Sequence, residues 1–192
     1  MDNLAPWRSL LARAQHRHRS LPQARYVQLA TVRPNGRPAN RTIVFRGFLG
    51  DSNQLQFVTD ARSPKPAQID YCAWGEVCWY FPKTREQFRF HGRLALVTEQ
   101  TADASLQAAR HQAWQKLSSA AQAQFLWPAP GQPRNPELSF PSPQTAPEPV
   151  AHFCLLLLDP ASVDHLELTG NPQHRHCYEY AQGVWQSYEI NP

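Results

Sequence analysis

Two short segments of the chain combine residue types that could bind an anion. The first is R-T-I-V-F-R, a mostly apolar run that begins at Arg41 and ends at Arg46. Side chains alternate between the two faces of a strand, so Arg41 and Ile43 are expected to share one face. Thr42, Val44 and Arg46 share the other. A guanidinium on an apolar strand costs desolvation energy unless water or an anion meets it, so the arginines either lie at the strand's solvated ends or bind a negative group.

The second segment is T-D-A-R-S-P-K, from Thr59 to Lys65. Pro64 and Pro66, which flank Lys65, fit only the first turn of a helix, which predicts a short helix over residues 65–71. A hydroxyl and a lysine beside the free N–H groups of a helix N-terminus form a phosphate-binding arrangement. Ser63 can also cap the helix, and the two roles can coexist.

Charge is distributed unevenly along the chain. The sequence carries 19 Lys and Arg, 15 Asp and Glu, and a net charge of +4. Residues 1–96 hold 15 basic and 6 acidic residues, whereas residues 97–192 hold 4 and 9. Sixteen of the basic residues are arginine, whose planar fork binds phosphate or carboxylate through two parallel hydrogen bonds. An anionic partner of the first half is expected: a nucleic acid, a phosphorylated cofactor or the acidic second half itself.

The composition excludes several classes of protein. With 42% hydrophobic and 18% charged residues, the chain is neither a disordered polyelectrolyte nor a fibre. No apolar run approaches the roughly 20 residues that span a bilayer, and residues 1–20 mix apolar and basic residues unlike a signal peptide. Four scattered cysteines indicate reduced thiols rather than disulfides or a zinc site. We therefore expect a soluble, cytoplasmic protein with one domain over residues 1–192, no metal and no membrane partner.

Strands dominate the secondary structure that the pattern predicts. Alternating β-branched and aromatic residues predict strands at residues 26–32, 41–48, 54–59, 76–81 and 87–97. Their short connections favour a closed or nearly closed antiparallel barrel, because closure removes exposed edges. A final strand pair is expected at residues 152–158 and 178–190.

Helices and one long irregular segment complete the prediction. Helices are expected at residues 6–15, 65–71 and 101–117, the last continuing to residue 125. Eight prolines fall within residues 128–149. This segment, which we call the arm, is predicted to be a long loop without regular structure, and such loops are often functional.

Taken in order, these segments resemble the FMN-binding split-barrel family related to pyridoxamine 5'-phosphate oxidase. No single motif is specific, but their order and spacing are. The motifs are R-T-I-V-F-R at 41–46, F-V-T-D at 57–60, S-P-K-P-A-Q-I at 63–69, W-Y-F-P at 79–82, N-P-Q-H-R-H-C-Y at 171–178 and W-Q-S-Y-E-I-N-P at 185–192. The resemblance implies a mainly β fold with some α: an antiparallel, Greek-key-like FMN-binding split barrel with flanking helices.

The resemblance also implies a cofactor site. The resemblance implies that one set of residues, with cationic and hydroxyl side chains, binds the FMN phosphate and ribityl chain. A second set, on the strands, lies along the isoalloxazine ring. Two residues distant in sequence reach the flavin near the subunit interface of a homodimer. The first set is Arg41, Arg46, Ser63 and Lys65; the second is Ile43, Val44 and Thr59; the distant residues are Gln87 and Arg175. Thr42 is a further expected cofactor-binding residue. Trp127, at the head of the arm, either covers the flavin or is a buried anchor.

Three positions depart from the family pattern. Pro64 stands where the family has an arginine, which removes one phosphate contact. Asn171 and Gln173 stand where the oxidase has the arginine and histidine that hold its pyridoxal substrate. An amide cannot supply the charge that binds a substrate phosphate, so an altered substrate site is expected. His174 and His176 either rebuild part of that site or are exposed loop histidines.

The leading hypothesis is an FMN-dependent, oxidase-like oxidoreductase acting on an unidentified small molecule. Hydride or electrons would pass from that substrate, or from NAD(P)H, to the flavin and then to an acceptor such as oxygen. No residue has the features of an obligatory general base, so no catalytic residue is assigned. One alternative is a flavin carrier or sensor without turnover. Another is a nucleic-acid-binding barrel, suggested by the basic first half, although its arginines are spread over several elements.

Overall fold

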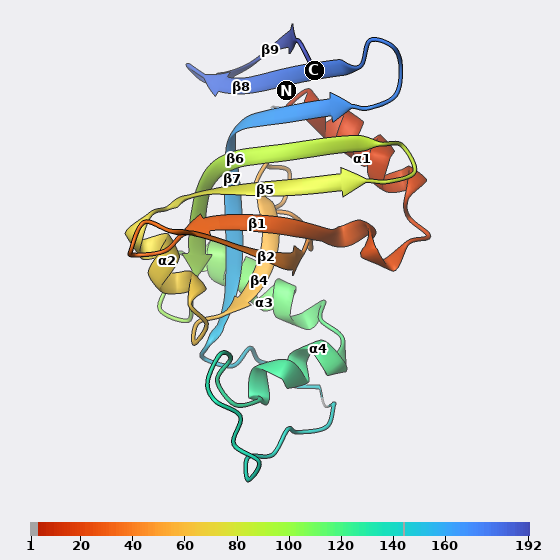
Figure 1. Cartoon of the computed structure of the whole chain (residues 1–192). Helices are drawn as coiled ribbons and strands as arrows, with labels where there is room; N and C mark the ends of the chain where they lie inside the picture. Colours follow the sequence, from red (N-terminus) through yellow and green to blue (C-terminus); the bar gives the residue numbers. More distant parts are fainter. Residues whose placement is uncertain (1–3, 144) are drawn as a thin grey trace.

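The computed structural model describes residues 4–143 and 145–192. Within these residues a nine-stranded antiparallel sheet forms the centre of the molecule (Figure 1). Its strands are β1 (Tyr26–Val32), β2 (Pro38–Val44), β3 (Gly47–Phe48), β4 (Leu55–Asp60), β5 (Trp74–Phe81), β6 (Glu86–Val97), β7 (Phe153–Glu167), β8 (His174–Ala181) and β9 (Val184–Ile190). Residues 1–3 and 144 lie outside the described residues, and the expectation of a single domain over 1–192 stays a prediction.

The sheet closes on itself through the strand that carries the first motif. The strand order is β2-β1-β5-β6-β7-β4-β3, and β2 and β3 are consecutive in the chain. The backbone N–H of Phe45 donates to Arg25 O at 2.8 Å, and that of Arg46 donates to Gln56 O at 2.9 Å. At this point the chain leaves β1 and joins β4, with a φ of +128° at Gly47 that suits glycine. The predicted uninterrupted strand over residues 41–48 is therefore wrong, because the run must pair with two different strands.

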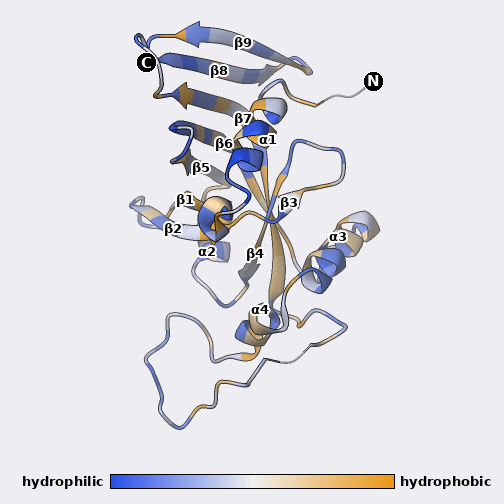
Figure 2. Ribbon diagram, turned by 90° about the vertical axis from the view of Figure 1, so that its right-hand side faces the viewer, coloured by the Kyte–Doolittle hydropathy of each residue, from blue (hydrophilic) through white to orange (hydrophobic). Residues whose placement is uncertain are grey.

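Strand β7 is shared by two hydrophobic cores. Leu156 and Leu158 pack into the barrel interior with its aromatic side chains, whereas Leu155 and Leu157 face a second core. Trp114 is the largest fully buried side chain of that second core. Burial on both faces explains why this part of the chain reads as a continuous apolar run. Figure 2 shows the contrast between hydrophobic β4 at the centre and hydrophilic β8 and β9 at one end.

The same strand is longer than the pattern predicts. The prediction ends it at residue 158, but it continues to Glu167 across a register shift at His91/Gly92 of β6. Pro160 lies at this irregularity, and such sites accommodate proline within a sheet. The second half of β7 then pairs with β8, so the predicted final strand pair at 152–158 and 178–190 is corrected to a β7–β8–β9 arrangement.

Helices flank the sheet. They are α1 (Trp7–Arg17), η1 (Pro22–Arg25), α2 (Lys65–Tyr71), α3 (Ala104–Gln115), α4 (Ser119–Ala123) and η2 (Gln124–Leu126). The helix predicted over 65–71 is confirmed, and the one predicted from residue 101 begins after Asp103, whose carboxylate accepts from the N–H groups of Ser105 and Leu106. In the described part of the chain, no helix has the length and apolar character needed to cross a membrane.

The arm follows η2. Residues 127–143 and 145–152 contain neither helix nor strand. Figures 1 and 2 show α4 and the arm at one end of the molecule and the β8–β9 hairpin at the other.

The close approach of β6 and β7 predicts a strong effect of adding one methyl group. A Cβ at Gly92 would lie 2.0 Å from Asp159 O and 2.8 Å from Pro160 Cα, both backbone atoms. We expect Gly92→Ala to lower the free energy of unfolding by about 2 kcal/mol or more. Urea unfolding measures this. Gly75→Ala is the matched control, because its Cβ would chiefly meet the flexible side chain of Leu94 and should cost roughly 1 kcal/mol. Equal costs would contradict this account of the bend.

Candidate cofactor-binding site

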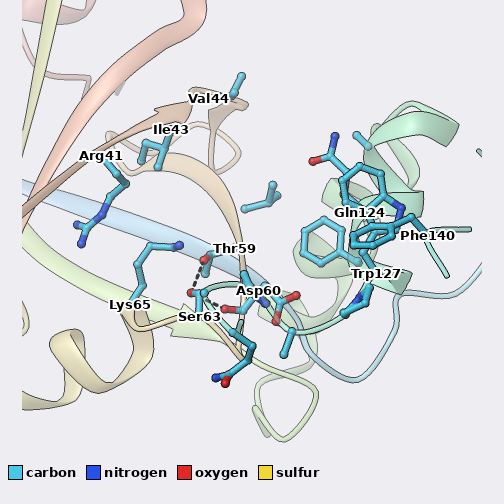
Figure 3. A pocket seen from close by; sticks show the side chains of 18 of the residues that line it. Arg41, Ile43, Val44, Thr59, Asp60, Ser63, Lys65, Gln124, Trp127 and Phe140 are labelled. Carbon is cyan, nitrogen blue, oxygen red and sulfur yellow. Dashed lines mark hydrogen bonds between the residues drawn. The ribbon is translucent and has the colours of Figure 1, made fainter. Parts of the chain in front are cut away.

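A cavity of about 830 Å³ lies between the barrel and the arm. This volume is typical of a small-molecule site. One side is formed by β2, the end of β4 and the start of α2, and the other by α4, η2 and the arm. Figure 3 shows Arg41 and Lys65 on the first side and Trp127 and Phe140 on the second.

Eight of the ten predicted cofactor-binding residues line this cavity. They come from three separate stretches of sequence, which the barrel brings together. They are Arg41, Thr42, Ile43, Val44, Arg46, Thr59, Ser63 and Lys65. Gln87 and Arg175 are not part of the lining.

The guanidinium of Arg41 is held by neighbours on two elements. Its Nη1 donates to Thr31 Oγ1 at 2.6 Å and to Leu29 O at 3.2 Å, both on β1. Its Nη2 donates to Oε1 of the buried Gln68 of α2 at 2.7 Å. Thr31 also donates to Gln68 Oε1 at 2.6 Å. These contacts fix the orientation of Arg41 before any ligand binds, and sequence analysis assigned no such role to Thr31 or Gln68.

Among the described residues, the three cations of this wall, Arg41, Arg46 and Lys65, form no ion pair, although the Asp60 carboxylate also lines the cavity. Burial lowers the pKa of Lys65, the charge of Arg41 lowers it further, and Asp60 only partly opposes this. Burial likewise lowers the pKa of Arg41 and of Arg46, with neighbouring arginines adding to each shift. The arginines stay protonated at neutral pH, so these partly desolvated, mutually repelling charges favour binding of an anion here.

The two hydroxyl groups of the second motif lie at the same wall. Ser63 Oγ donates to Asp60 O at 2.7 Å and lies 3.5 Å from Thr59 Oγ1 (Figure 3). Helix α2 has Pro64 at its N-cap and no side-chain cap. The expected capping role of Ser63 is therefore wrong, because its hydroxyl turns back to the end of β4 instead.

The opposite wall is aromatic. Trp127 is half-buried and packs edge-on against Phe140 with ring centroids 5.5 Å apart, and its Nε1 donates to Pro141 O at 3.3 Å. Trp127 lines the cavity, so it faces any ligand as well as being anchored. Phe140 was not identified from the sequence. The clue was the arm itself, a long proline-rich loop, but no local pattern indicates which of its residues turn inward.

The wall residues fit FMN. Arg46 lines this cavity and also a second one beside α1 and η1, and its Nε is buried without a hydrogen-bond partner among the described residues. Lys65 Nζ donates no hydrogen bond within residues 4–143 and 145–192. These donors match a phosphate and its hydroxylated chain, while buried Ile43 and half-buried Val44 offer apolar surface to a flat ring. A group with a dianionic end and an aromatic body satisfies both parts of the cavity.

Arg175 and Gln87 make contacts elsewhere. Arg175 Nη2 donates to Asp164 Oδ2 at 2.7 Å, and Arg89 Nη2 donates to the same oxygen at 2.7 Å. Gln87 Oε1 accepts a long contact of 3.6 Å from Cys78 Sγ. Both predicted residues thus lie on strands away from the cavity of their own chain.

One further group of side chains has the composition of a metal site. Glu86, His165 and Glu167 offer ligand atoms within 4.8 Å of one another. His165 Nε2 lies 3.0 Å from Glu86 Oε2, and burial lowers the pKa of this histidine despite that hydrogen bond. Arg13 lies 4.0 Å from Glu86 and 3.9 Å from Glu167. Because Arg13 supplies positive charge at the two carboxylates, we interpret the group as an ion-pair network.

The predicted histidine roles near the C-terminus also need correction. His174 and His176 lie on β8 rather than in a loop. His174 is exposed with its Nδ1 3.1 Å from Glu189 Oε1, and His176 is half-buried.

Comparison with known proteins gives consistent matches. The model of the family described as "Pyridoxamine 5'-phosphate oxidase, FMN-binding domain" matches residues 4–98. A protein of Arabidopsis thaliana named pyridoxine/pyridoxamine 5'-phosphate oxidase 2 is 40% identical over 196 residues, which cover 99% of this chain and 98% of the relative.

Two solved structures share the fold. A pyridoxamine 5'-phosphate oxidase-related, FMN binding protein from Nostoc punctiforme PCC 73102 has a TM-score of 0.94 and 59% identity, with 98% of this chain and 99% of the other covered. PhzG from Burkholderia lata 383, in complex with tetrahydrophenazine-1-carboxylic acid, has a TM-score of 0.77 and 17% identity, covering 100% and 99%. The second supports the fold alone. Together they confirm the predicted split barrel with flanking helices.

The Asp164 ion pairs predict a pH-dependent stability. Burial opposes ionisation of Asp164, but hydrogen bonds from Arg175 and Arg89 outweigh it and lower its pKa. Their stabilisation is therefore present at neutral pH and is lost as pH falls through the lowered pKa. We expect Asp164→Asn to cost about 1–3 kcal/mol at neutral pH and less at about pH 3.

Urea unfolding at the two pH values measures the difference. The exposed Asp70→Asn is the control and should change stability little at either pH. A cost of Asp164→Asn that stays the same at both pH values would contradict the pairing.

Proposed function

Because the chain belongs to the pyridoxamine 5'-phosphate oxidase family of FMN-binding proteins, we propose that it is an FMN-dependent oxidoreductase with an altered substrate site. The observation that carries the proposal is the wall of three partly desolvated cations, Arg41, Arg46 and Lys65, beside apolar surface in one cavity. Such a wall suits a phosphorylated redox cofactor better than a neutral ligand.

The protein's own residues hold and orient the cofactor in this proposal. Arg41 and Lys65 bind the phosphate, and Ser63 and Arg46 bind phosphate or ribityl oxygens. The strand residues that lie along the ring are Thr42, Ile43, Val44 and Thr59. When bound, FMN supplies the capacity to accept and pass on hydride or electrons. The arm side, with Trp127, limits the access of water to the cavity.

We also propose a homodimer with FMN at the subunit interface. Gln87 and Arg175 lie outside the lining of their own chain's cavity, so in this proposal they contact the FMN that is bound by the second copy of the chain. Sedimentation of the FMN-loaded protein tests this arrangement. A cytoplasmic location is part of the same proposal, since the four cysteines are free thiols and such thiols persist in reducing compartments.

The substrate is proposed to be a small molecule other than pyridoxamine 5'-phosphate. The name of the Arabidopsis relative supports oxidase chemistry in this family branch. Here, however, Asn171 and Gln173 replace the two residues that bind the oxidase substrate, and neither carries a charge. The neighbouring His174 pairs with Glu189, which reduces its ability to replace them.

Removing two cations should abolish cofactor retention. Each charge-assisted hydrogen bond contributes about 1.5–3 kcal/mol, so Arg41→Ala with Lys65→Ala should weaken FMN binding by at least about 100-fold. Flavin absorbance after purification and a fluorescence titration with FMN measure this.

The control for that experiment is Arg37→Ala, which removes an exposed arginine of the β1–β2 turn. It should bind FMN like the unmodified protein. Unchanged FMN affinity in the double variant would refute the assigned phosphate site, and an unmodified protein that stays colourless with added FMN would refute the function.

Restoring the family's charged residues should create activity on the family's substrate. We expect Asn171→Arg with Gln173→His to raise kcat/KM for pyridoxamine 5'-phosphate by at least about tenfold, because a new charge-assisted hydrogen bond stabilises the bound phosphate. Oxygen consumption and flavin reduction measure turnover.

The unmodified protein provides the reference for this test. A kcat/KM of roughly 10⁴ M⁻¹s⁻¹ or more with pyridoxamine 5'-phosphate would contradict the altered site. Flavin that is reduced by none of NADH, NADPH and pyridoxamine 5'-phosphate would favour a carrier or sensor instead.

A further inference from the structure

Arg62 lies in the loop between β4 and α2, next to the proposed phosphate site. Its guanidinium forms a bidentate ion pair with the carboxylate of Asp60, in which Nη2 donates to Oδ2 at 2.6 Å and Nε donates to Oδ1 at 3.0 Å. The backbone N–H of Arg62 donates to the same carboxylate at 2.7 Å. This side-on geometry fixes the plane of the guanidinium.

The remaining donors of Arg62 cross to the start of the arm. Nη1 donates to Trp127 O at 3.0 Å, and Nη2 donates to Phe125 O at 3.1 Å. These two carbonyls lie more than 60 residues along the chain from Arg62. His152 Nε2 also contacts Phe125 O, so both ends of the irregular segment meet here.

We propose that Arg62 is a positioning residue that latches Trp127 across the cofactor cavity, so that the arm forms its substrate-facing wall. This latch consists of the Asp60 carboxylate, the Arg62 guanidinium and the carbonyls of Phe125 and Trp127. The inference rests on the proposed function for the identity of the ligand in the cavity, but the latch itself rests only on the contacts above.

The chemistry of the latch requires arginine. A single guanidinium serves a carboxylate and two carbonyls at once, whereas a lysine ammonium lacks the planar fork. Burial opposes the charge on Asp60, but the hydrogen bonds from Arg62 outweigh it and lower the pKa of the carboxyl. Asp60 is therefore paired with Arg62, and its charge only partly opposes the lowering of the pKa of Lys65 by burial and by Arg41.

The latch is also continuous with the cofactor wall. Ser63 Oγ, which lines the cavity, donates to Asp60 O, and the Asp60 carboxylate holds Arg62. The Asp60–Arg62 pair thus joins the cationic wall to the aromatic wall, beside a second connection through His152. A change at Arg62 should move the arm while leaving Arg41 and Lys65 in place.

A protease site in the arm makes the latch measurable. Arg134 is the only Lys or Arg between Lys116 and Arg175, and it is exposed. The rate of trypsin cleavage after Arg134 therefore reports how firmly the arm is held. Quenching of bound FMN fluorescence by acrylamide, a neutral quencher, reports how well the arm covers the flavin.

Arg62→Ala in the FMN-loaded full-length protein is the main test. We expect cleavage after Arg134 to accelerate at least roughly tenfold and acrylamide quenching to rise, because the charge-assisted hydrogen bonds to the carbonyls of Phe125 and Trp127 are both lost. Quenching is compared at saturating FMN, because the Asp60 carboxylate lines the cavity and loses its partner in this variant, which should weaken FMN binding. Arg62→Lys should behave like Arg62→Ala if the fork geometry, rather than the charge, holds the arm.

Two further variants separate the latch from general destabilisation. Arg37→Ala should match the unmodified protein in both readouts. Trp127→Ala keeps the carbonyl that Arg62 binds but removes the contacts of the indole with Phe140 and Pro141, so quenching should rise as in Arg62→Ala and cleavage should rise less than in Arg62→Ala. This variant still decides the proposal if Arg62→Ala does not fold.

Two results would overturn the proposal: cleavage and quenching of Arg62→Ala equal to those of Arg37→Ala, or unchanged quenching in Trp127→Ala. Failure of the proposed function looks different. If the unmodified protein retains no FMN, the function is refuted, while cleavage of Arg62→Ala without FMN still decides whether Arg62 holds the arm.

Discussion

The site depends on one electrostatic constraint: three cations share a partly desolvated wall, and the carboxylate in that wall, Asp60, is hydrogen-bonded to Arg62. Asp60 is close enough to influence Lys65, yet its oxygens are taken by Arg62. The wall therefore carries more positive than negative side chains, which favours an anionic ligand. Holding like charges together requires rigid supports, and the hydrogen bonds of Arg41 to Thr31 and Gln68 supply them.

Local rules were enough to find only part of this wall. The preference of proline for a helix's first turn acts over a few residues and located helix α2 from the sequence. Strand alternation did not predict the wall, because it separated Arg41 and Ile43 from Thr42, Val44 and Arg46, and all five line the cavity. The resemblance then assigned a ligand to eight residues that the barrel brings together. Their individual roles, and those of Gln87 and Arg175, stay predictions.

The features that were missed depend on residues distant in sequence. The predicted strand is interrupted at Phe45 because β3 pairs with β4 rather than with β1. Strand β7 continues past Pro160 because Gly92 of β6 leaves room for its backbone. Nothing within either segment signals these partners. Likewise, nothing in the sequence around Arg62 distinguishes it from a surface arginine, because its partner, the carbonyl of Trp127, is distant in sequence.

The double burial of β7 has a consequence for how the protein loses its structure. Leu155 and Leu157 belong to the core beside α3 and α4, while Leu156 and Leu158 belong to the barrel core. Unfolding of either part therefore exposes the apolar side chains on one face of β7. The ligand cavity sits where these two parts meet. Thermal denaturation should therefore release the bound group in one cooperative event, with no half-melted form that still carries it.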